Sequence, residues 1–166
     1  MNILYLHGLE SKLSDEKRVL LEKYGTVIAP DLDYKLNPDM IQNLNDEYKD
    51  QDINAIIGSS MGGFAGFHLA NSLGICALLY NPALPYRNSV VQNIPLHLSK
   101  KHSPLMRIVL GGQDEVIKAK DNLAFLSQNC SDLKDCSIEI INELAHQIPV
   151  PIFEEQTENF FERLCY

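Results

Sequence analysis

Short apolar runs alternate with longer stretches in which apolar and polar residues follow a helical spacing. Six of the apolar runs end at glycine, proline or polar residues, and their shortness and lack of alternation are typical of strands buried on both faces of a sheet. We expect these strands at residues 3–6, 26–30, 53–58, 75–83, 105–112 and 137–141.

The stretches between the strands carry helix-start and helix-stop signals. Serine or asparagine precedes two of the first turns, and glycine follows the last apolar position of two helices. The expected helices run from a cap at Ser14 to Gly25, from a cap at Asn37 and a first-turn Pro38 to Tyr48, from Met61 to Leu73 before Gly74, and over residues 116–128 and 152–164.

The alternation of strand and helix predicts the α/β class. We expect residues 1–166 to form a single domain, a mostly parallel sheet of about six strands with helices on both faces, whose ligands gather at the carboxyl ends of the strands. The proline-containing stretch at residues 82–103 is expected to be a surface excursion near the site, too short for a large cap domain.

The net charge indicates which classes of partner are disfavoured, and the cysteines indicate the cellular compartment. The 22 acidic and 14 basic side chains give a formal charge of −8, which disfavours nucleic acid and anionic membranes as partners. No apolar run reaches membrane-spanning length, and no signal peptide precedes the first strand-like run. The cysteines show no C-x-x-C spacing, so we expect a reducing cytoplasm and no metal site. They are Cys76, Cys130, Cys136 and Cys165.

The sequence GSSMG at residues 58–62 matches the G-x-S-x-G pattern of a nucleophile elbow and lies between an expected strand and an expected helix. Ser60 is then the residue on the turn, and so tight a turn needs glycine two positions before and after it, as Gly58 and Gly62 provide. Ser59 fits poorly because bulky residues stand at the same offsets from it. A phosphate-binding loop is the alternative, but the stretch lacks a lysine and departs from the Walker and dinucleotide-binding spacings.

A serine nucleophile needs a base, and the base needs an acid to orient it. On an α/β fold with this motif, the chain order is serine, acid, histidine. Asp114 follows the fifth expected strand and His146 follows the sixth, while Glu143 is a second candidate for the acid. The other histidines precede the serine, lie in a helix or lie in the irregular stretch, so they fit the role of base less well. They are His7, His68, His97 and His102.

Two backbone N–H groups are candidates for binding the oxyanion of a tetrahedral intermediate. Met61 follows the nucleophile at the amino end of a helix, and Leu9 follows the His7-Gly8 pair, where glycine permits close approach of the chain. We expect His7 to shape this loop rather than to transfer protons. Loop positions also make six residues candidates for pocket walls or for plain packing: Leu9, Ala83, Leu84, Tyr86, Ile117 and Ile148.

The segments YLHGLES, GSSMGG, YNPA, GGQDEV and AHQI occur in the order seen in small α/β-hydrolases. Over nearly its whole length the chain resembles most closely the YqiA-like esterases. The resemblance implies Ser60 as nucleophile, Asp114 as acid and His146 as base, with Leu9 and Met61 as oxyanion donors. It also implies a sheet without the amino-terminal hairpin of the general hydrolase fold, and hydrolysis of carboxylic esters with short acyl chains.

These observations predict a serine esterase that uses no cofactor and acts on a small-molecule ester. A thioesterase with the same three residues is an alternative, because thioester cleavage needs the same groups. A binding or regulatory protein that keeps the hydrolase fold is another. It is suggested by Glu143, Leu144 and Ala145, which precede His146 where such enzymes often have glycines and an acidic residue.

Overall fold

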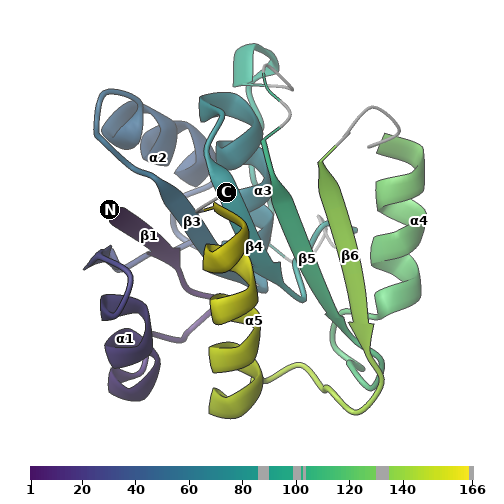
Figure 1. The fold of residues 1–166 in the computed structure, drawn as a ribbon. Coiled ribbons are helices and arrows are strands. Elements are labelled where there is room, and N and C mark those ends of the chain that lie inside the picture. The colour runs from purple at the N-terminus through teal and green to yellow at the C-terminus, as the bar shows by residue number, and fades with distance from the viewer. Residues whose placement is uncertain (86–89, 99–101, 103, 130–134, 165–166) are drawn as a thin grey trace.

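The computed structural model describes residues 1–85, 90–98, 102, 104–129 and 135–164. A six-stranded sheet with the order β2-β1-β3-β4-β5-β6 forms its centre, and every pair of neighbouring strands is parallel (Figure 1). The predicted α/β fold is therefore confirmed. The elements in chain order are β1 (Asn2–Leu6), α1 (Asp15–Glu22), β2 (Thr26–Ile28), α2 (Met40–Tyr48), β3 (Ala55–Ser59), α3 (Met61–Leu73), β4 (Cys76–Tyr80), the 3-10 helix η1 (Leu96–Leu98), β5 (Met106–Gly111), α4 (Ala119–Asn129), β6 (Cys136–Ile141) and α5 (Val150–Leu164).

Helices cover both faces of the sheet, which is why the central strands β1, β3 and β4 are almost entirely apolar. Figure 1 shows α1 and α5 together in front of the sheet, where the ring of Tyr24 stacks on Phe161 of α5 at 4.4 Å between centroids. On the other face α2 packs on α3, and Phe67 of α3 meets Phe125 of α4 edge to face. Each face therefore has its own hydrophobic core.

The strand register brings the carboxyl ends of five strands to one edge of the sheet. Leu6 of β1 pairs with Gly58 of β3, and Ser59 pairs with Tyr80 of β4. The pairing of β5 with β6 likewise runs to the last residue of each strand. The loops that follow these strands therefore lie beside one another, which is the usual place for a ligand site in a parallel sheet.

Two helix ends differ from the sequence-based expectation for local reasons. The side-chain Oδ1 of Asn37 accepts the N–H of Asp39 (3.1 Å), so a turn forms first and α2 begins at Met40. Gly25 does not close α1, which ends before it. Instead, a Cβ on Gly25 would overlap the carbonyl oxygen of Met1, so its missing side chain lets β2 approach the start of β1.

The expectation that residues 82–103 form a surface excursion holds only in part for the residues that the structure describes, since Val91 and Leu96 are 64% and 91% exposed. Leu84 and Leu98 are buried in the core on the α3 face. Gln92 Nε2 donates hydrogen bonds to the carbonyl oxygens of Tyr34 (2.8 Å) and Asn37 (3.0 Å). Part of this segment therefore packs against the core and the loop between β2 and α2, because burial of Leu84 and Leu98 removes apolar surface from water.

The start of α3 lies unusually close to the end of β1. A Cβ on Gly62 would overlap the carbonyl oxygen of Leu6 and lie 2.6 Å from that of His7. A Cβ on Gly58 would overlap the carbonyl oxygen of Gly62. Both glycines are therefore required by space, as the turn motif predicts, and the approach places the first turn of α3 against the loop that follows β1.

Gly62→Ala tests this constraint, and Gly66→Ala in the same helix is its control. A Cβ on Gly66 would meet only side-chain ends, Leu79 Cδ2 at 2.9 Å and Ile56 Cγ2 at 3.2 Å. We expect Gly62→Ala to lower the free energy of unfolding by about 3 kcal/mol or more, and Gly66→Ala to change it by only about 1 kcal/mol. Urea unfolding followed by circular dichroism measures both, and equal effects would contradict the packing argument.

Buried tyrosines predict a loss of stability at alkaline pH. Burial raises the pKa of Tyr5 from 10.0 to about 12, and it also raises the pKa values of Tyr34 and Tyr80. The folded chain keeps these protons to a higher pH than the unfolded chain. The contribution of the protonated tyrosines to the free energy of unfolding is therefore complete below pH 10 and is lost as the pH rises toward 12. Tyr5 alone lowers the free energy of unfolding by roughly 2 kcal/mol by pH 12.

Urea midpoints measured at intervals between pH 9 and pH 12 test this prediction. Tyr5→Phe removes one titrating group, so its stability should fall less steeply over that range than that of the wild type. A wild-type midpoint that stays level above pH 10 would show that the buried phenols do not control alkaline unfolding.

Candidate active site

Ser60 occupies the turn between β3 and α3 in a backbone conformation that few residues other than glycine adopt, with φ 55° and ψ −118°. Its N–H donates to the carbonyl oxygen of Tyr80 (3.0 Å), and its carbonyl oxygen accepts the N–H groups of Phe64 and Ala83 (3.0 Å each). Hydrogen bonds thus hold the strained turn from the strand side and from the helix side. This is the backbone arrangement in which a G-x-S-x-G serine stands above the end of its strand.

Asp114 and His146, from the loops after β5 and β6, are hydrogen bonded to each other. Oδ2 of Asp114 lies 2.8 Å from Nδ1 of His146, and the two side chains are 0% and 23% exposed. Oδ1 of Asp114 accepts the N–H groups of Val116 and Ile117 (2.8 Å each), which moves the start of α4 from the expected residue 116 to Ala119. A carboxylate that accepts on both oxygens leaves the Nδ1 proton on the ring, so the Nε2 of neutral His146 is a proton acceptor.

The loop after β1 is shaped by His7. The N–H of Leu32 donates to Nε2 of His7 (2.9 Å), so the proton of the neutral ring is on Nδ1, which donates to the carbonyl oxygen of Gly8 (2.7 Å). Ser11 Oγ also donates to that oxygen (3.2 Å). Because a peptide group is planar and trans, the N–H of Leu9 points away from these donors.

The same loop lies against the serine. A Cβ on Gly8 would lie 3.1 Å from the Cβ of Ser60 and 3.3 Å from the carbonyl oxygen of Ser59. Met61, at the first position of α3, adds a second backbone N–H beside Ser60, because the first N–H groups of a helix have no partner inside the helix. The structure therefore places both expected donor peptides close to this serine.

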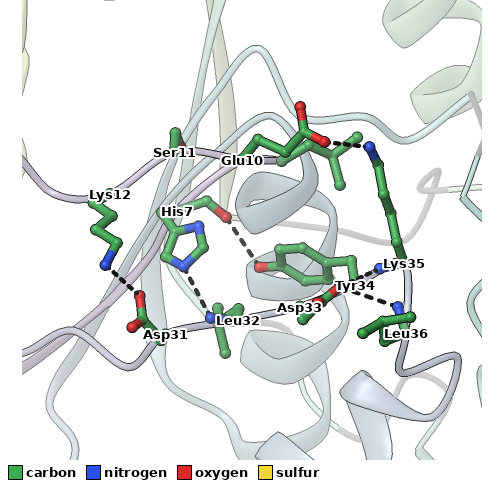
Figure 2. Close-up of a pocket in the computed structure, with 11 residues that line it drawn as sticks. His7, Glu10, Ser11, Lys12, Asp31, Leu32, Asp33, Tyr34, Lys35 and Leu36 are labelled. Atoms are coloured by element: carbon green, nitrogen blue, oxygen red, sulfur yellow. Dashed lines mark hydrogen bonds and ion pairs between the residues drawn. The ribbon is translucent and has the colours of Figure 1, made fainter.

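A cleft of about 740 Å³ opens between the loop after β1 and the loop after β2, at residues 7–12 and 31–36 (Figure 2). Ion pairs cross from one loop to the other at two places, Lys12 with Asp31 (3.5 Å) and Lys35 with Glu10. The lining also includes the apolar side chains of Leu9, Leu32 and Leu36. The cleft thus combines an apolar lining with charged groups whose charges are mostly paired.

Asn81 is the residue that the sequence analysis did not single out. It follows β4, is 1% exposed, and its carboxamide donates to the carbonyl oxygens of Ala145 (3.0 Å) and His146 (3.2 Å). It thereby connects the loop of His146 to the strand beside Ser60. The YNPA segment was the available signal, since a polar residue between a strand and a proline is unusual for pure packing, but its partners are distant in sequence.

Most of the remaining candidates do not reach the site. Glu143, the second candidate for the acid, is exposed, whereas Asp114 contacts His146 directly. Four candidate pocket walls are instead buried in the two cores: Ala83, Leu84, Ile117 and Ile148. Three residues considered above lie outside the described residues: Tyr86, Cys130 and Cys165.

The described residues offer neither a metal site nor a membrane span. They contain no group of three or more histidine, cysteine, aspartate or glutamate side chains placed to hold a metal ion. Within the same residues, the helices are too short or too polar to span a bilayer.

Comparisons with solved structures show a shared fold. SOBER1 of Arabidopsis thaliana superposes with a TM-score of 0.72 at 15% identity, over 100% of this chain and 99% of that chain. The esterase PF2001 of Pyrococcus furiosus gives 0.71 at 15% identity, over 98% and 81%. The alpha/beta hydrolase domain-containing protein 10 of mouse gives 0.68 at 13% identity, over 98% and 90%.

Sequence comparisons place the chain in a family. No curated protein sequence matches it significantly. Residues 2–103, more than half of the chain, match the sequence model of the uncharacterised protein family UPF0227. The chain therefore belongs to the UPF0227 family.

Proposed function

We propose that this protein is a serine hydrolase that cleaves carboxylic esters of small molecules with short acyl chains. The observation that carries the proposal is the hydrogen bond between the buried Asp114 carboxylate and His146, at the same sheet edge as the strained Ser60. A buried acid that orients a histidine, with a serine on a tight turn at the same sheet edge, is the combination of groups that acyl transfer needs. Cofactors have no part in this chemistry.

In the proposed reaction Ser60 Oγ attacks the ester carbonyl carbon while Nε2 of His146 takes the hydroxyl proton. The same nitrogen then gives this proton to the leaving alcohol as the bond between the carbonyl carbon and the alcohol oxygen breaks, which leaves an acyl-enzyme. Water, activated by His146, releases the acid. Asp114 stays ionised and stabilises the imidazolium that forms in each step.

The N–H groups of Leu9 and Met61 are proposed to bind the oxyanion of the tetrahedral intermediate. The orientation of the Gly8 carbonyl toward His7 supports this role, because it turns the Leu9 N–H the other way before any charge develops. The cleft beside Leu9 is proposed to take the substituent of the ester. Its carboxylates, Glu10, Asp31 and Asp33, outnumber its two lysines, so a neutral group suits it better than an anionic one.

Ser60→Ala and His146→Ala test the triad, and Ser59→Ala is the control because it changes the neighbouring serine. We expect the first two variants to lower kcat for p-nitrophenyl acetate by a factor on the order of 10⁴, and Ser59→Ala to retain most of the activity. The series from acetate to octanoate measures the acyl chain length that the site accepts. Equal activity of wild type and Ser60→Ala would contradict the proposal.

Two further measurements separate the alternative functions. Comparison of phenyl acetate with S-phenyl thioacetate decides between an esterase and a thioesterase, since the two substrates differ in the leaving atom alone. A fluorophosphonate should label Ser60 covalently in the wild type and not in Ser60→Ala. No labelling and no turnover would instead support a binding protein that keeps the hydrolase fold.

His7→Ala tests whether the histidine orients the oxyanion donor. Without the imidazole the Gly8 carbonyl loses its 2.7 Å hydrogen bond, so we expect kcat to fall by a factor on the order of 100 with little change in KM. Tyr34→Phe is the control for damage to the same wall, because the Tyr34 hydroxyl donates to the carbonyl oxygen of His7 and not to that of Gly8. An equal loss of kcat in both variants would contradict a specific role for the imidazole.

A further inference from the structure

Asn81, the residue after β4, is fixed at the point where three strands end. It is 1% exposed and has a φ of 41°, in the left-handed region. Its N–H donates to the carbonyl oxygen of Val109 in β5 (2.9 Å). The preceding residue, Tyr80, accepts the N–H of Ser60, which follows β3. The backbone of Asn81 is therefore tied to the strands on either side of β4.

The carboxamide of Asn81 connects the two loops that carry Asp114 and His146. Its Oδ1 accepts the N–H of Gly111 (2.7 Å), whose carbonyl oxygen accepts the N–H of Asp114 (3.3 Å). Its Nδ2 donates to the carbonyl oxygens of Ala145 (3.0 Å) and His146 (3.2 Å). One side chain thus holds the backbone on both sides of the Asp114–His146 hydrogen bond.

Few other side chains meet these demands. The partners are one N–H group and two carbonyl oxygens, so they determine which end of the amide is oxygen and which is nitrogen. Aspartate has the same shape but no donor, and its charge would face two carbonyl oxygens. Asparagine also tolerates a positive φ better than most residues. The position therefore combines a backbone requirement with a hydrogen-bond requirement.

We propose that Asn81 is a positioning residue for the reaction: its carboxamide sets the separation of the loops that carry Asp114 and His146 and holds both beside the turn of Ser60. This role rests on the proposed hydrolase function. The role concerns the reaction rate as well as the stability of the fold, because a displacement of about 1 Å between reacting groups is enough to lower a rate on the order of 100-fold.

Two substitutions and one control test the role. Asn81→Gly removes the carboxamide without straining the backbone at positive φ, and Asn81→Asp keeps the acceptor but removes both donors. Asn71→Ala is the control, because Asn71 is also a buried asparagine (2% exposed) whose Nδ2 donates to a carbonyl oxygen, that of Phe67. It lies in α3, about 15 Å along the helix from Met61.

The readouts are kcat and KM for p-nitrophenyl acetate, the melting temperature, and the low-field proton NMR signal of the His146 Nδ1–H group. We expect both Asn81 variants to lose kcat on the order of 100-fold with KM nearly unchanged, and to lose or broaden the Nδ1–H signal. Asn71→Ala should lower the melting temperature but keep both kcat and the signal. His146→Ala identifies the signal by removing it.

Retention of kcat and of the Nδ1–H signal in both Asn81 variants would overturn the proposal. Failure of Asn81→Gly to fold under conditions in which Asn71→Ala folds would also overturn it, because Asn81 would then be a structural residue. The proposed function fails separately, if wild-type Ser60 is neither labelled nor active. The NMR signal does not depend on turnover, so it reports on Asn81 in either case.

Discussion

The close approach of α3 to the end of β1 is the constraint on which the rest of the site depends. It exists because Gly62 has no side chain where the carbonyl oxygens of Leu6 and His7 pass. The approach brings Gly8 against Ser60, so a strand end and a helix amino end meet around one serine. In the proposed reaction, backbone N–H groups held in this way need no rearrangement when negative charge develops, which is the condition for strong electrostatic stabilisation.

Residues with strained backbone conformations lie at this edge of the sheet. Among the residues that the structure describes, those other than glycine with positive φ are Glu10, Ser60 and Asn81, which lie after β1, β3 and β4. Conformations of this kind cost on the order of 1–3 kcal/mol each and persist only where the surroundings hold them. Here the hydrogen bonds of each turn and the cores on both faces of the sheet hold them.

The site is built from polar groups whose hydrogen bonds are already made. The buried Asp114 carboxylate accepts three hydrogen bonds, and His7 uses both ring nitrogens for the backbone of two loops. Such a network is rigid because breaking any one bond leaves a buried polar group without a partner. The hydrogen bonds of Asp114 and His7 thus hold the loops that follow β1 and β5 in place.

The sequence by itself determined the strand and helix order, the turn at Ser60 and the limits of α3, which runs from Met61 to Leu73 before a left-handed Gly74 as expected. These features depend on residues close together in the chain, whose periodicity and glycine positions are visible in one dimension. Only the tertiary structure decided the burial of Leu84 and Leu98 after β4, the cleft beside Leu9 and the hydrogen bonds of Asn81. Those features depend on partners far along the chain, such as Asn81 and Ala145, 64 residues apart, and no local pattern specifies which distant backbone groups will face a side chain.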